Sequence, residues 1–494
     1  MPAQLEQAID VAAARIVGES LKTAGYTEAA ITAALGDDAY SARSKEMPVL
    51  LRRIPPTRLG TVIRSFFLIQ PVSVADLTRA IGERGVGALE AAGVAEINGD
   101  EVVPSLRILP VADLFVASDD DPRHEGEFAP DFVAAYTAAT RLCDSLTPRP
   151  DVERALDVGT GSGVHALLAA RHAKHVIATD VNPRALAFTE LNAALNGLRN
   201  VEVREGSLFE PVAGETFDLV TCNAPYVISP ETRWAYRDGG FAADEVSERV
   251  VLTAAEHLND GGYAALLVSW LGHEEAKPDA RATEWIERTG CDGWILPIWG
   301  GDPVTHAATW NDHLAGDTEA YEAALDEWTS YLADLGVDWV SEGGILLHKR
   351  SGDANTIRID SVEEEELEDA GDQILRAFES RAVLAEHETD EQLFDAHVAI
   401  AGPVRLELEL EPEGTGTVVV GAHVHLDEGT HPAVEVSGDM IEVLAALDGA
   451  KRYGDVVESV VTSLDFTPAE ALRLRRESLE VGRELLELGA LCFE

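Results

Sequence analysis

The chain has 494 residues, 46% of them hydrophobic and 26% charged, which exceeds what a single hydrophobic core supports and excludes a disordered protein. The formal net charge of −50 opposes binding to nucleic acids, although an acidic surface is also what a cytoplasm of very high salt would favour. No apolar run is long enough to cross a membrane and no secretory pattern opens the chain, so we expect a cytoplasmic protein without a membrane partner.

The first region, residues 1–120, predicts a helical domain that closes in a winged-helix pattern. Two short helices precede two short strands: Val74–Ile81, Arg84–Ala92, Val94–Ile97 and Val102–Leu106. Asn98-Gly99 between the strands suits a tight two-residue turn. Such a module reads nucleic acid in some proteins and serves as a dimerisation or lid module in others. The second helix carries Glu90 as well as Arg84 and is not basic, which disfavours DNA reading.

The central region, residues 121–350, follows a boundary loop at Ser118–Pro122 and opens with a linking helix over Phe128–Leu146. Six strands are expected: Ala155–Val158, Val176–Thr179, Val201–Arg204, Leu219–Cys222, Tyr263–Val268 and Trp294–Ile298. Four helices alternate with them: Val164–His172, Pro183–Asn196, Asp244–His257 and Ala280–Thr289. A helix over Ala315–Leu335 and a last strand over Gly344–His348 complete the pattern. This alternation predicts an α/β fold, with a parallel sheet between two layers of helices.

The last region, residues 351–494, predicts a separate α+β accessory domain. The acidic run Glu363–Glu366 is typical of a solvated linker or helix face. Strands are expected over Val404–Leu410 and Val418–Leu426, and the stretch Met440–Leu491 is amphipathic and helical. No combination of side chains in this region indicates catalysis.

A glycine-rich turn after the first central strand is the strongest signal in the chain. The residues Leu156-Asp157-Val158-Gly159-Thr160-Gly161-Ser162-Gly163 have the spacing G-x-G-x-G. Glycines let the backbone turn sharply and approach a ligand closely. The turn resembles motif I of class I methyltransferases and differs from the G-x-G-x-x-G of dinucleotide-binding folds. The resemblance implies an S-adenosylmethionine site formed by five of these residues: Asp157, Gly159, Thr160, Gly161 and Gly163.

An acidic residue, Asp180, ends the second strand. A carboxylate there can accept hydrogen bonds from both ribose hydroxyls of an adenosine. Together with the glycine turn, Asp180 favours S-adenosylmethionine over a nucleotide cofactor. The resemblance also implies cofactor contacts for Asn182 and, after the third strand, for Ser207 and Leu208. Related sequences often have an aspartate where Ser207 stands.

The tetrapeptide Asn223-Ala224-Pro225-Tyr226 follows the fourth strand, at the sheet edge where open α/β folds bind ligands. It resembles the N-P-P-Y motif of amino-methyltransferases, with alanine in place of the first proline. Planar nitrogens are poor nucleophiles because their lone pairs are delocalised. The Asn223 side-chain oxygen and the Ala224 carbonyl can accept their N–H groups, which favours the pyramidal form that develops in the transition state. Pro225 stiffens the turn, and Tyr226 offers a flat face for stacking.

The central region as a whole resembles the release-factor glutamine N5-methyltransferases and the methyltransferase small domain superfamily, as far as the glycine-rich segment Tyr236–Phe241. The resemblance implies a Rossmann-like, seven-stranded methyltransferase sheet and transfer of a methyl group to nitrogen. Our first hypothesis is an N-methyltransferase acting on a protein side-chain amide or a small molecule, which the acidic composition favours. The second is a methyltransferase for adenine N6 or guanine N2 in ribosomal or transfer RNA. A cofactor-binding protein without turnover is a third, against which intact Asn223 and Tyr226 argue.

Cysteine and histidine placement predicts no metal. Four cysteines lie far apart without a C-x-x-C pair, which excludes a disulfide framework and a zinc ribbon: Cys143, Cys222, Cys291 and Cys492. Three histidines on or after the motif I helix are expected to be surface or packing residues: His165, His172 and His175. The sequence does not indicate an oligomeric state.

Overall fold

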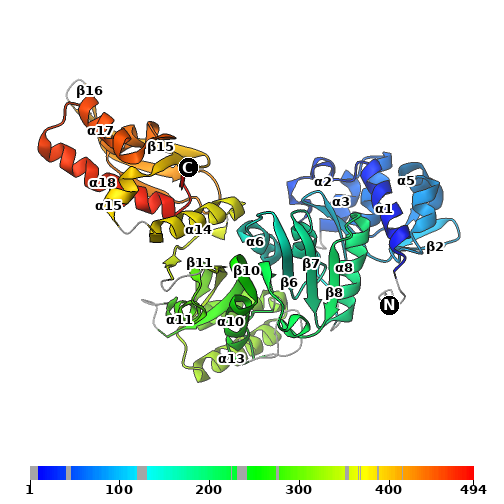
Figure 1. Cartoon of the computed structure of the whole chain (residues 1–494). Helices are drawn as coiled ribbons and strands as arrows, with labels where there is room; N and C mark the ends of the chain where they lie inside the picture. Colours follow the sequence, from blue (N-terminus) through cyan, green and yellow to red (C-terminus); the bar gives the residue numbers. More distant parts are fainter. Residues whose placement is uncertain are drawn as a thin grey trace.

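The computed structural model describes residues 9–40, 46–119, 131–223, 225–230, 242–273, 278–350, 355–364, 367, 369–386, 389–413 and 416–494. A central sheet with its helices lies between an N-terminal part and a C-terminal part, which are on opposite sides of it (Figure 1). Among the described helices, none has both the length and the apolar character that a membrane span requires.

The central sheet has eight strands in the order β13-β11-β12-β10-β9-β6-β7-β8. Their bounds are β6 Val152–Val158, β7 Ala173–Asp180, β8 Val201–Glu205, β9 Phe217–Cys222, β10 Leu258–Gly272, β11 Asp292–Gly301, β12 Trp339–His348 and β13 Ile357–Ile359. All pairs are parallel except those of β12, which is antiparallel to both neighbours. The expected α/β methyltransferase fold is confirmed, although β13 adds an eighth strand to the seven expected and the sheet is mixed rather than wholly parallel.

Helices cover both faces of this sheet. On one face, α7 Val164–Ala169 and α8 Pro183–Leu195 lie beside β6, β7 and β8, and α6 Ala138–Leu146 lies beside β10 and β12. Two others, α10 Glu245–His257 and α11 Ala280–Thr289, pack on the opposite face in a separate core that includes Trp270 and Trp285. The linking helix α6 begins at Ala138, later than expected, because Thr137 and Thr140 form a capping box that starts the helix there.

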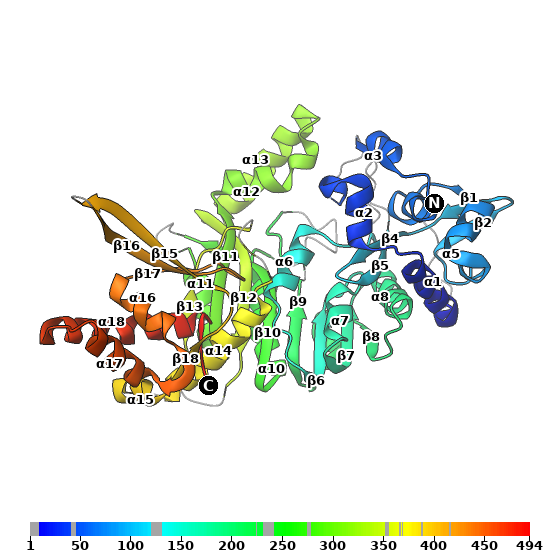
Figure 2. The same ribbon diagram turned by 90° about the horizontal axis from the view of Figure 1, so that it is seen from above.

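An insert joins β11 to β12. It contains α12 Pro303–Trp310, a 3₁₀ turn at Asp312–Leu314 and α13 Thr318–Asp334. Figure 2 shows α12 and α13 projecting together beyond one edge of the central sheet. Asp302 caps α12 and Asp317 caps α13, so both helix starts are encoded locally.

The N-terminal part is a helical domain with a small three-stranded sheet, β1-β3-β2. Its helices are α1 Val11–Thr23, α2 Glu28–Leu35, α3 Met47–Arg53, α4 Arg58–Val62 and α5 Val74–Ala88, and its strands are β1 Val72–Ser73, β2 Ala95–Asn98 and β3 Glu101–Pro104. The expected hairpin is present, with Gly99 in the left-handed region at its turn. The two expected helices form one element, α5, with a break at Gly82.

A further hairpin, β4 Arg107–Val111 with β5 Leu114–Ser118, attaches the N-terminal part to the central domain. Asn192 of α8 accepts from the Ala117 amide at 2.7 Å and donates to the Ala117 carbonyl at 2.9 Å. Asn196, one turn later, makes the same two bonds to Phe115, at 2.8 and 2.7 Å. The two amide side chains thus replace a neighbouring strand for β5.

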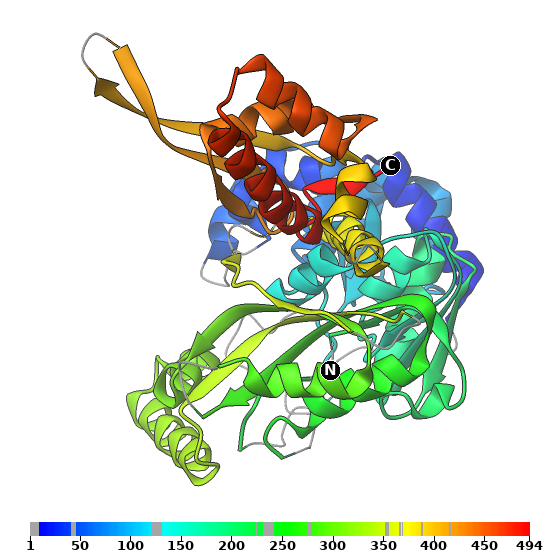
Figure 3. The ribbon, with the colours of Figure 1, turned by 60° about the vertical axis from the view of Figure 1, so that its left-hand side comes forward.

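The C-terminal part is α+β, as expected. It contains α14 Gly371–Glu386, α15 Asp390–Asp395, β14 His397–Ile400, β15 Val404–Glu413, β16 Gly416–Leu426, β17 Ala433–Val436, α16 Gly438–Ala445, β18 Asp448–Arg452, α17 Tyr453–Ser463, α18 Pro468–Glu487 and β19 Leu491–Phe493. The β15–β16 hairpin extends away from the remainder (orange in Figure 3). The stretch after Met440 is not wholly helical, because β18 and β19 pair with the two edges of β14. Such pairing joins segments that are distant in the sequence, so the local pattern of apolar residues does not predict these short strands.

Candidate functional site

The glycine turn between β6 and α7 has the backbone that its composition requires. Gly159, Gly161 and Gly163 have φ angles of 68°, 56° and 87°, a region that other residues rarely adopt. A Cβ atom at Gly163 would lie 2.9 Å from the Thr189 side chain, whereas one at Gly161 would meet no atom within 4 Å. Gly163 therefore permits close packing on α8, and the space where a Cβ atom of residue 161 would lie is empty.

Asp157, at the end of β6, uses its carboxylate to hold the turn. It is 1% exposed and accepts hydrogen bonds from the Thr160 hydroxyl at 2.6 Å and the Thr221 hydroxyl at 2.9 Å. A third bond comes from the backbone N–H of Ala166 in α7, at 3.1 Å. The carboxylate is thus directed at protein donors on three elements. These three bonds hold the turn in place.

Asp180, at the end of β7, lies beside this turn. Its Oδ2 accepts from the Gly161 N–H at 2.9 Å and its Oδ1 from the Asn182 N–H at 2.9 Å. Burial raises the pKa of Asp180, and these backbone hydrogen bonds oppose the shift. A carboxylate has about four acceptor positions, so these two bonds leave others available to a ligand.

The neighbours of Asp180 differ in what their side chains do. Asn182 caps α8 by accepting from the Arg184 N–H at 3.0 Å, and it donates to the Asp131 carbonyl at 3.0 Å. Its polar atoms therefore serve the fold. Val181, which the sequence analysis did not consider, is 53% exposed although it is apolar. An exposed valine carries no signal in a single sequence, because scattered surface apolar residues are common.

The segment after β8 is held against the end of β7. The Leu208 carbonyl accepts from the Thr179 hydroxyl at 3.1 Å, and Leu208 has a positive φ of 47°. The Ser207 carbonyl accepts from the Glu210 N–H at 2.9 Å and closes a turn. These contacts bring Ser207 and Leu208 to the same sheet edge as Asp180.

The tetrapeptide after β9 lies next to the glycine turn. Cys222 pairs with Val158 in the parallel β6–β9 ladder, so Asn223 and Gly159 each follow directly at adjacent strand ends. Pro225 is half-buried. Ala224 and the segment Tyr236–Phe241 lie outside the described residues.

Tyr226 is buried rather than open to the sheet edge. Its side chain is 7% exposed, belongs to the large central core cluster, and has a pKa that burial raises well above 10. Its carbonyl accepts a hydrogen bond from the Ser269 hydroxyl. The expected stacking role for the Tyr226 ring therefore stays a prediction.

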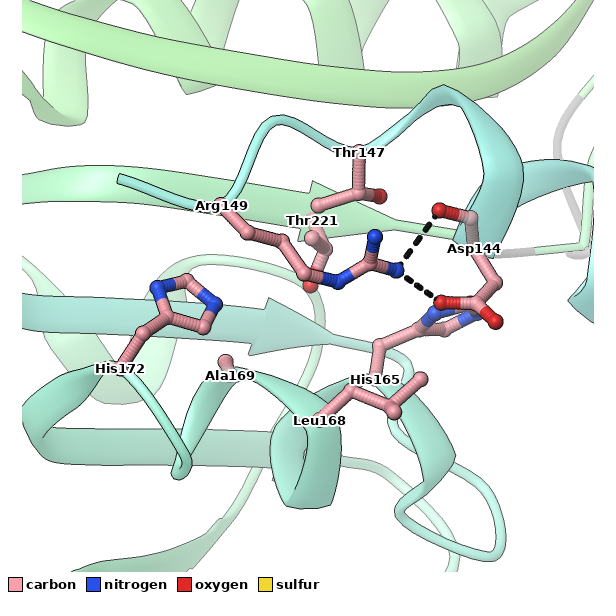
Figure 4. A pocket seen from close by; sticks show the side chains of 8 residues that line it. All are labelled: Asp144, Thr147, Arg149, His165, Leu168, Ala169, His172 and Thr221. Atoms are coloured by element: carbon pink, nitrogen blue, oxygen red, sulfur yellow. Dashed lines mark hydrogen bonds and ion pairs between the residues drawn. The ribbon is translucent and has the colours of Figure 1, made fainter. Parts of the chain in front are cut away.

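A small hollow lies behind the glycine turn, between α6, α7 and the sheet (Figure 4). Its lining residues are Asp144, Thr147, Arg149, His165, Leu168, Ala169, His172 and Thr221. Arg149 donates to the Asp144 carboxylate, and Thr221 donates to Asp157. None of the site residues expected from the sequence lines this hollow. In the described parts of the chain, no group of three or more histidine, cysteine or acidic side chains gathers to hold a metal.

Comparison with known families agrees with this arrangement. Residues 134–275 match the family model for the methyltransferase small domain. This segment of the central domain is a methyltransferase small domain. It is therefore a class I, S-adenosylmethionine-dependent methyltransferase domain, and it includes β6, β9 and the glycine turn. Residues 23–105, in the N-terminal part, match a domain of unknown function, DUF7059.

Curated relatives of the methyltransferase domain share about a third of its residues. The release factor glutamine methyltransferase of Geobacter sulfurreducens is 35% identical over 133 residues, which are 24% of this chain and 46% of that protein. The ribosomal protein uL3 glutamine methyltransferase of Bradyrhizobium diazoefficiens is 34% identical over 178 residues, which are 32% of this chain and 54% of that protein. The chain spans about half the length of the curated relatives it matches.

Among solved structures, the ribosomal protein L11 methylase of Lactobacillus delbrueckii subsp. bulgaricus matches 43% of this chain and 78% of its own. The identity is 19% and the TM-score is 0.25, which is too low to carry an argument about function.

Proposed function

We propose that the chain is an S-adenosylmethionine-dependent N-methyltransferase whose acceptor is a protein side-chain amide of the glutamine type. The observation that carries this proposal is the position of Asn223. Asn223 follows β9 at the strand end next to the glycine turn. A nitrogen held by Asn223 would therefore lie at the same carboxyl edge of the sheet as that turn. Two of the curated relatives, a release factor and a ribosomal protein uL3 glutamine methyltransferase, support an amide acceptor.

The residues around the glycine turn fit S-adenosylmethionine. Asp180 supplies a carboxylate for the ribose hydroxyls, and the exposed Val181 supplies an apolar surface for the adenine ring. Gly161 has no side chain in the space that the amino-acid end of the ligand would approach. Ser207 and Leu208, held at the same edge, border the adenine. Asp157 contributes by fixing the turn rather than by contact.

S-adenosylmethionine held by the glycine turn and Asp180 would supply an electrophilic methyl group for the acceptor nitrogen and would leave as S-adenosylhomocysteine. Asn223 accepts an N–H of the acceptor amide with its side-chain oxygen, and the carbonyl of residue 224 accepts the other. These bonds withdraw the lone pair from conjugation and orient it toward the methyl carbon. The nitrogen then loses one proton to solvent, which leaves a neutral N-methyl amide.

RNA is a second candidate acceptor, favoured by one feature of the N-terminal part. The chain has 88 acidic residues, but none of them lies in residues 47–75, between Glu46 and Asp76. Three arginines of this stretch are exposed on or next to α3 and α4: Arg52, Arg53 and Arg58. Exposed arginines without acidic neighbours in the sequence are suited to phosphate contacts.

The experiment that tests the proposed function is transfer of a labelled methyl group from S-adenosylmethionine into a cell extract. We expect the label to be lost after protease and to survive nuclease. Asn223→Ala should bind the cofactor normally but transfer methyl groups about 10²–10³-fold more slowly, as when a preorganised polar group is removed. Label that nuclease removes would favour RNA, and label that survives both would indicate a small molecule. A fully active Asn223→Ala would contradict the proposed role of that residue.

A further inference from the structure

The backbone that follows Asn223 is held by hydrogen bonds from distant parts of the chain. The Ser269 hydroxyl of β10 donates to the Tyr226 carbonyl. Two residues on, the Ile228 carbonyl accepts from Nε2 of His306 at 2.9 Å. The alternate carbonyls of residues 226 and 228 are thus fixed, one by the sheet and one by the α12–α13 insert.

His306 is the centre of a buried polar network. It is 6% exposed, and its Nδ1 lies 3.2 Å from Oε1 of Glu342, which is also 6% exposed on β12. The same Oε1 accepts from the Trp310 indole at 2.8 Å, and the Trp328 ring packs at 5.7 Å from the imidazole. Glu342 is paired across the sheet with Ser269, so both anchors of the backbone meet at one point of the sheet.

The hydrogen-bond roles in this network follow from its acceptors. A carbonyl oxygen only accepts, so Nε2 of His306 must carry the hydrogen directed at Ile228. Nδ1 faces a carboxylate oxygen, and two lone pairs at 3.2 Å would repel each other. The polar partners of the His306 ring are thus the Ile228 carbonyl on one side and the Glu342 carboxylate on the other. Removing either side chain breaks the bond to Ile228 or leaves a buried polar atom unpaired.

The insert also holds the other end of the same loop. The Ala243 N–H donates to the Tyr331 hydroxyl of α13 at 2.9 Å. Ile228 packs with Leu332 and Leu271 in a separate apolar cluster, against which Tyr331 and Ala243 also lie. Residues 225–230 and 242–243 are thus joined through α12 and α13, which leave the sheet together (Figure 2).

We propose that His306 is a positioning residue for the acceptor site, and that the α12–α13 insert sets the geometry of Asn223 through the Ile228 carbonyl. This inference rests on the proposed function, because it assigns to His306 the orientation of the group that holds the acceptor nitrogen. His306 acts on the acceptor side alone. It has no contact with the glycine turn or with Asp180 among the described interactions, so cofactor binding does not depend on it.

The test is His306→Leu in the full chain, with His313→Leu as its matched control. His313 is exposed on the same insert, in the 3₁₀ turn. For His306→Leu we expect methyl transfer into the protein fraction of an extract to fall about 10²-fold at saturating S-adenosylmethionine. The KM and Kd for S-adenosylmethionine should stay within about twofold of wild type, and His306→Gln, which retains a donor toward Ile228, should recover part of the rate. His313→Leu should behave as wild type.

A readout that needs no acceptor separates this inference from the proposed function. Backbone amide exchange in a peptide covering residues 226–229 should be faster in His306→Leu than in wild type and in His313→Leu. If wild type methylates no acceptor but this exchange difference is present, the proposed function fails and the positioning role stands. Unchanged exchange, an unchanged rate, or an equal loss in His313→Leu would each overturn the role of His306. A rate loss accompanied by weakened cofactor binding would also overturn it, because the effect would then not be confined to the acceptor side.

Discussion

Single carboxylates at the ends of β6 and β7 have different tasks although both follow buried strands. Asp157 is buried and accepts from three protein donors, which hold the turn, α7 and β9 together. Asp180 accepts two backbone N–H groups, so acceptor positions remain on its carboxylate. A ligand can therefore gain a charge-assisted hydrogen bond from Asp180 and not from Asp157.

At the residue scale we expect Asp180→Ala to weaken S-adenosylmethionine binding about 10–100-fold, since a hydrogen bond to a charged group contributes about 1.5–3 kcal/mol. The matched control is Asp151→Ala. Asp151 is an exposed aspartate just before β6, at the amino end of the sheet. Calorimetric titration gives the Kd for S-adenosylmethionine of both variants. An equal Kd in wild type and Asp180→Ala would show that Asp180 does not contact the cofactor.

The same residue predicts a pH dependence of binding. Burial raises the pKa of Asp180, so its carboxylate becomes protonated at a higher pH than an ordinary aspartate. The ionised form is the double acceptor, so cofactor affinity should be full at neutral pH and fall on acidification through this raised pKa. Titrations at decreasing pH check the direction, and affinity that is lost only as pH rises would contradict the assignment.

Helix α8 connects the N-terminal part to the cofactor turn. Asn192 and Asn196 both bond the backbone of β5, but only Asn192 also donates to the Ser162 carbonyl in the glycine turn, at 2.8 Å. The i, i+4 spacing places the two amides on one face of the helix, opposite alternate residues of the strand. The Asn192 side chain thus bonds both β5 of the N-terminal part and the glycine turn.

At the element scale, the two asparagines are matched probes of this connection. Asn192→Leu and Asn196→Leu each leave backbone groups of β5 unpaired, which costs about 1–3 kcal/mol, so both should lower the midpoint of thermal unfolding. Only Asn192→Leu also removes the hydrogen bond to the Ser162 carbonyl, so only this variant should weaken S-adenosylmethionine binding. Equal affinities in the two variants would show that the link between β5 and the turn has no effect on the cofactor.

The charge of the whole molecule bears on the choice of acceptor. The chain has 88 acidic residues against 38 lysines and arginines, while the stretch from residue 47 to residue 75 has no acidic residue. The overall field repels polyanions, and the local arginines attract them. Ionic strength separates the two effects, because phosphate contacts release counterions and lose affinity steeply with salt.

At the scale of the molecule, we expect kcat/KM for a protein acceptor to change less than about tenfold between roughly 50 and 200 mM salt. An RNA acceptor held by several phosphate contacts would lose about 10³-fold or more over this range. Initial rates with protein and RNA fractions of an extract, measured across the series, provide the comparison. A steep loss with the protein fraction would contradict the proposed amide acceptor.

The sequence by itself determined most elements of the central domain and the position of its motifs, because these signals are local. Glycines at positive φ, a proline at the start of α8 and alternating strands and helices act within a few residues. What only the tertiary structure decided involves segments far apart in the chain. Examples are the three donors around Asp157, the burial of Tyr226, the eighth strand β13 and the bond from His306 to Ile228. Such contacts form when the sheet aligns distant strand ends, and they leave no period or spacing in the sequence.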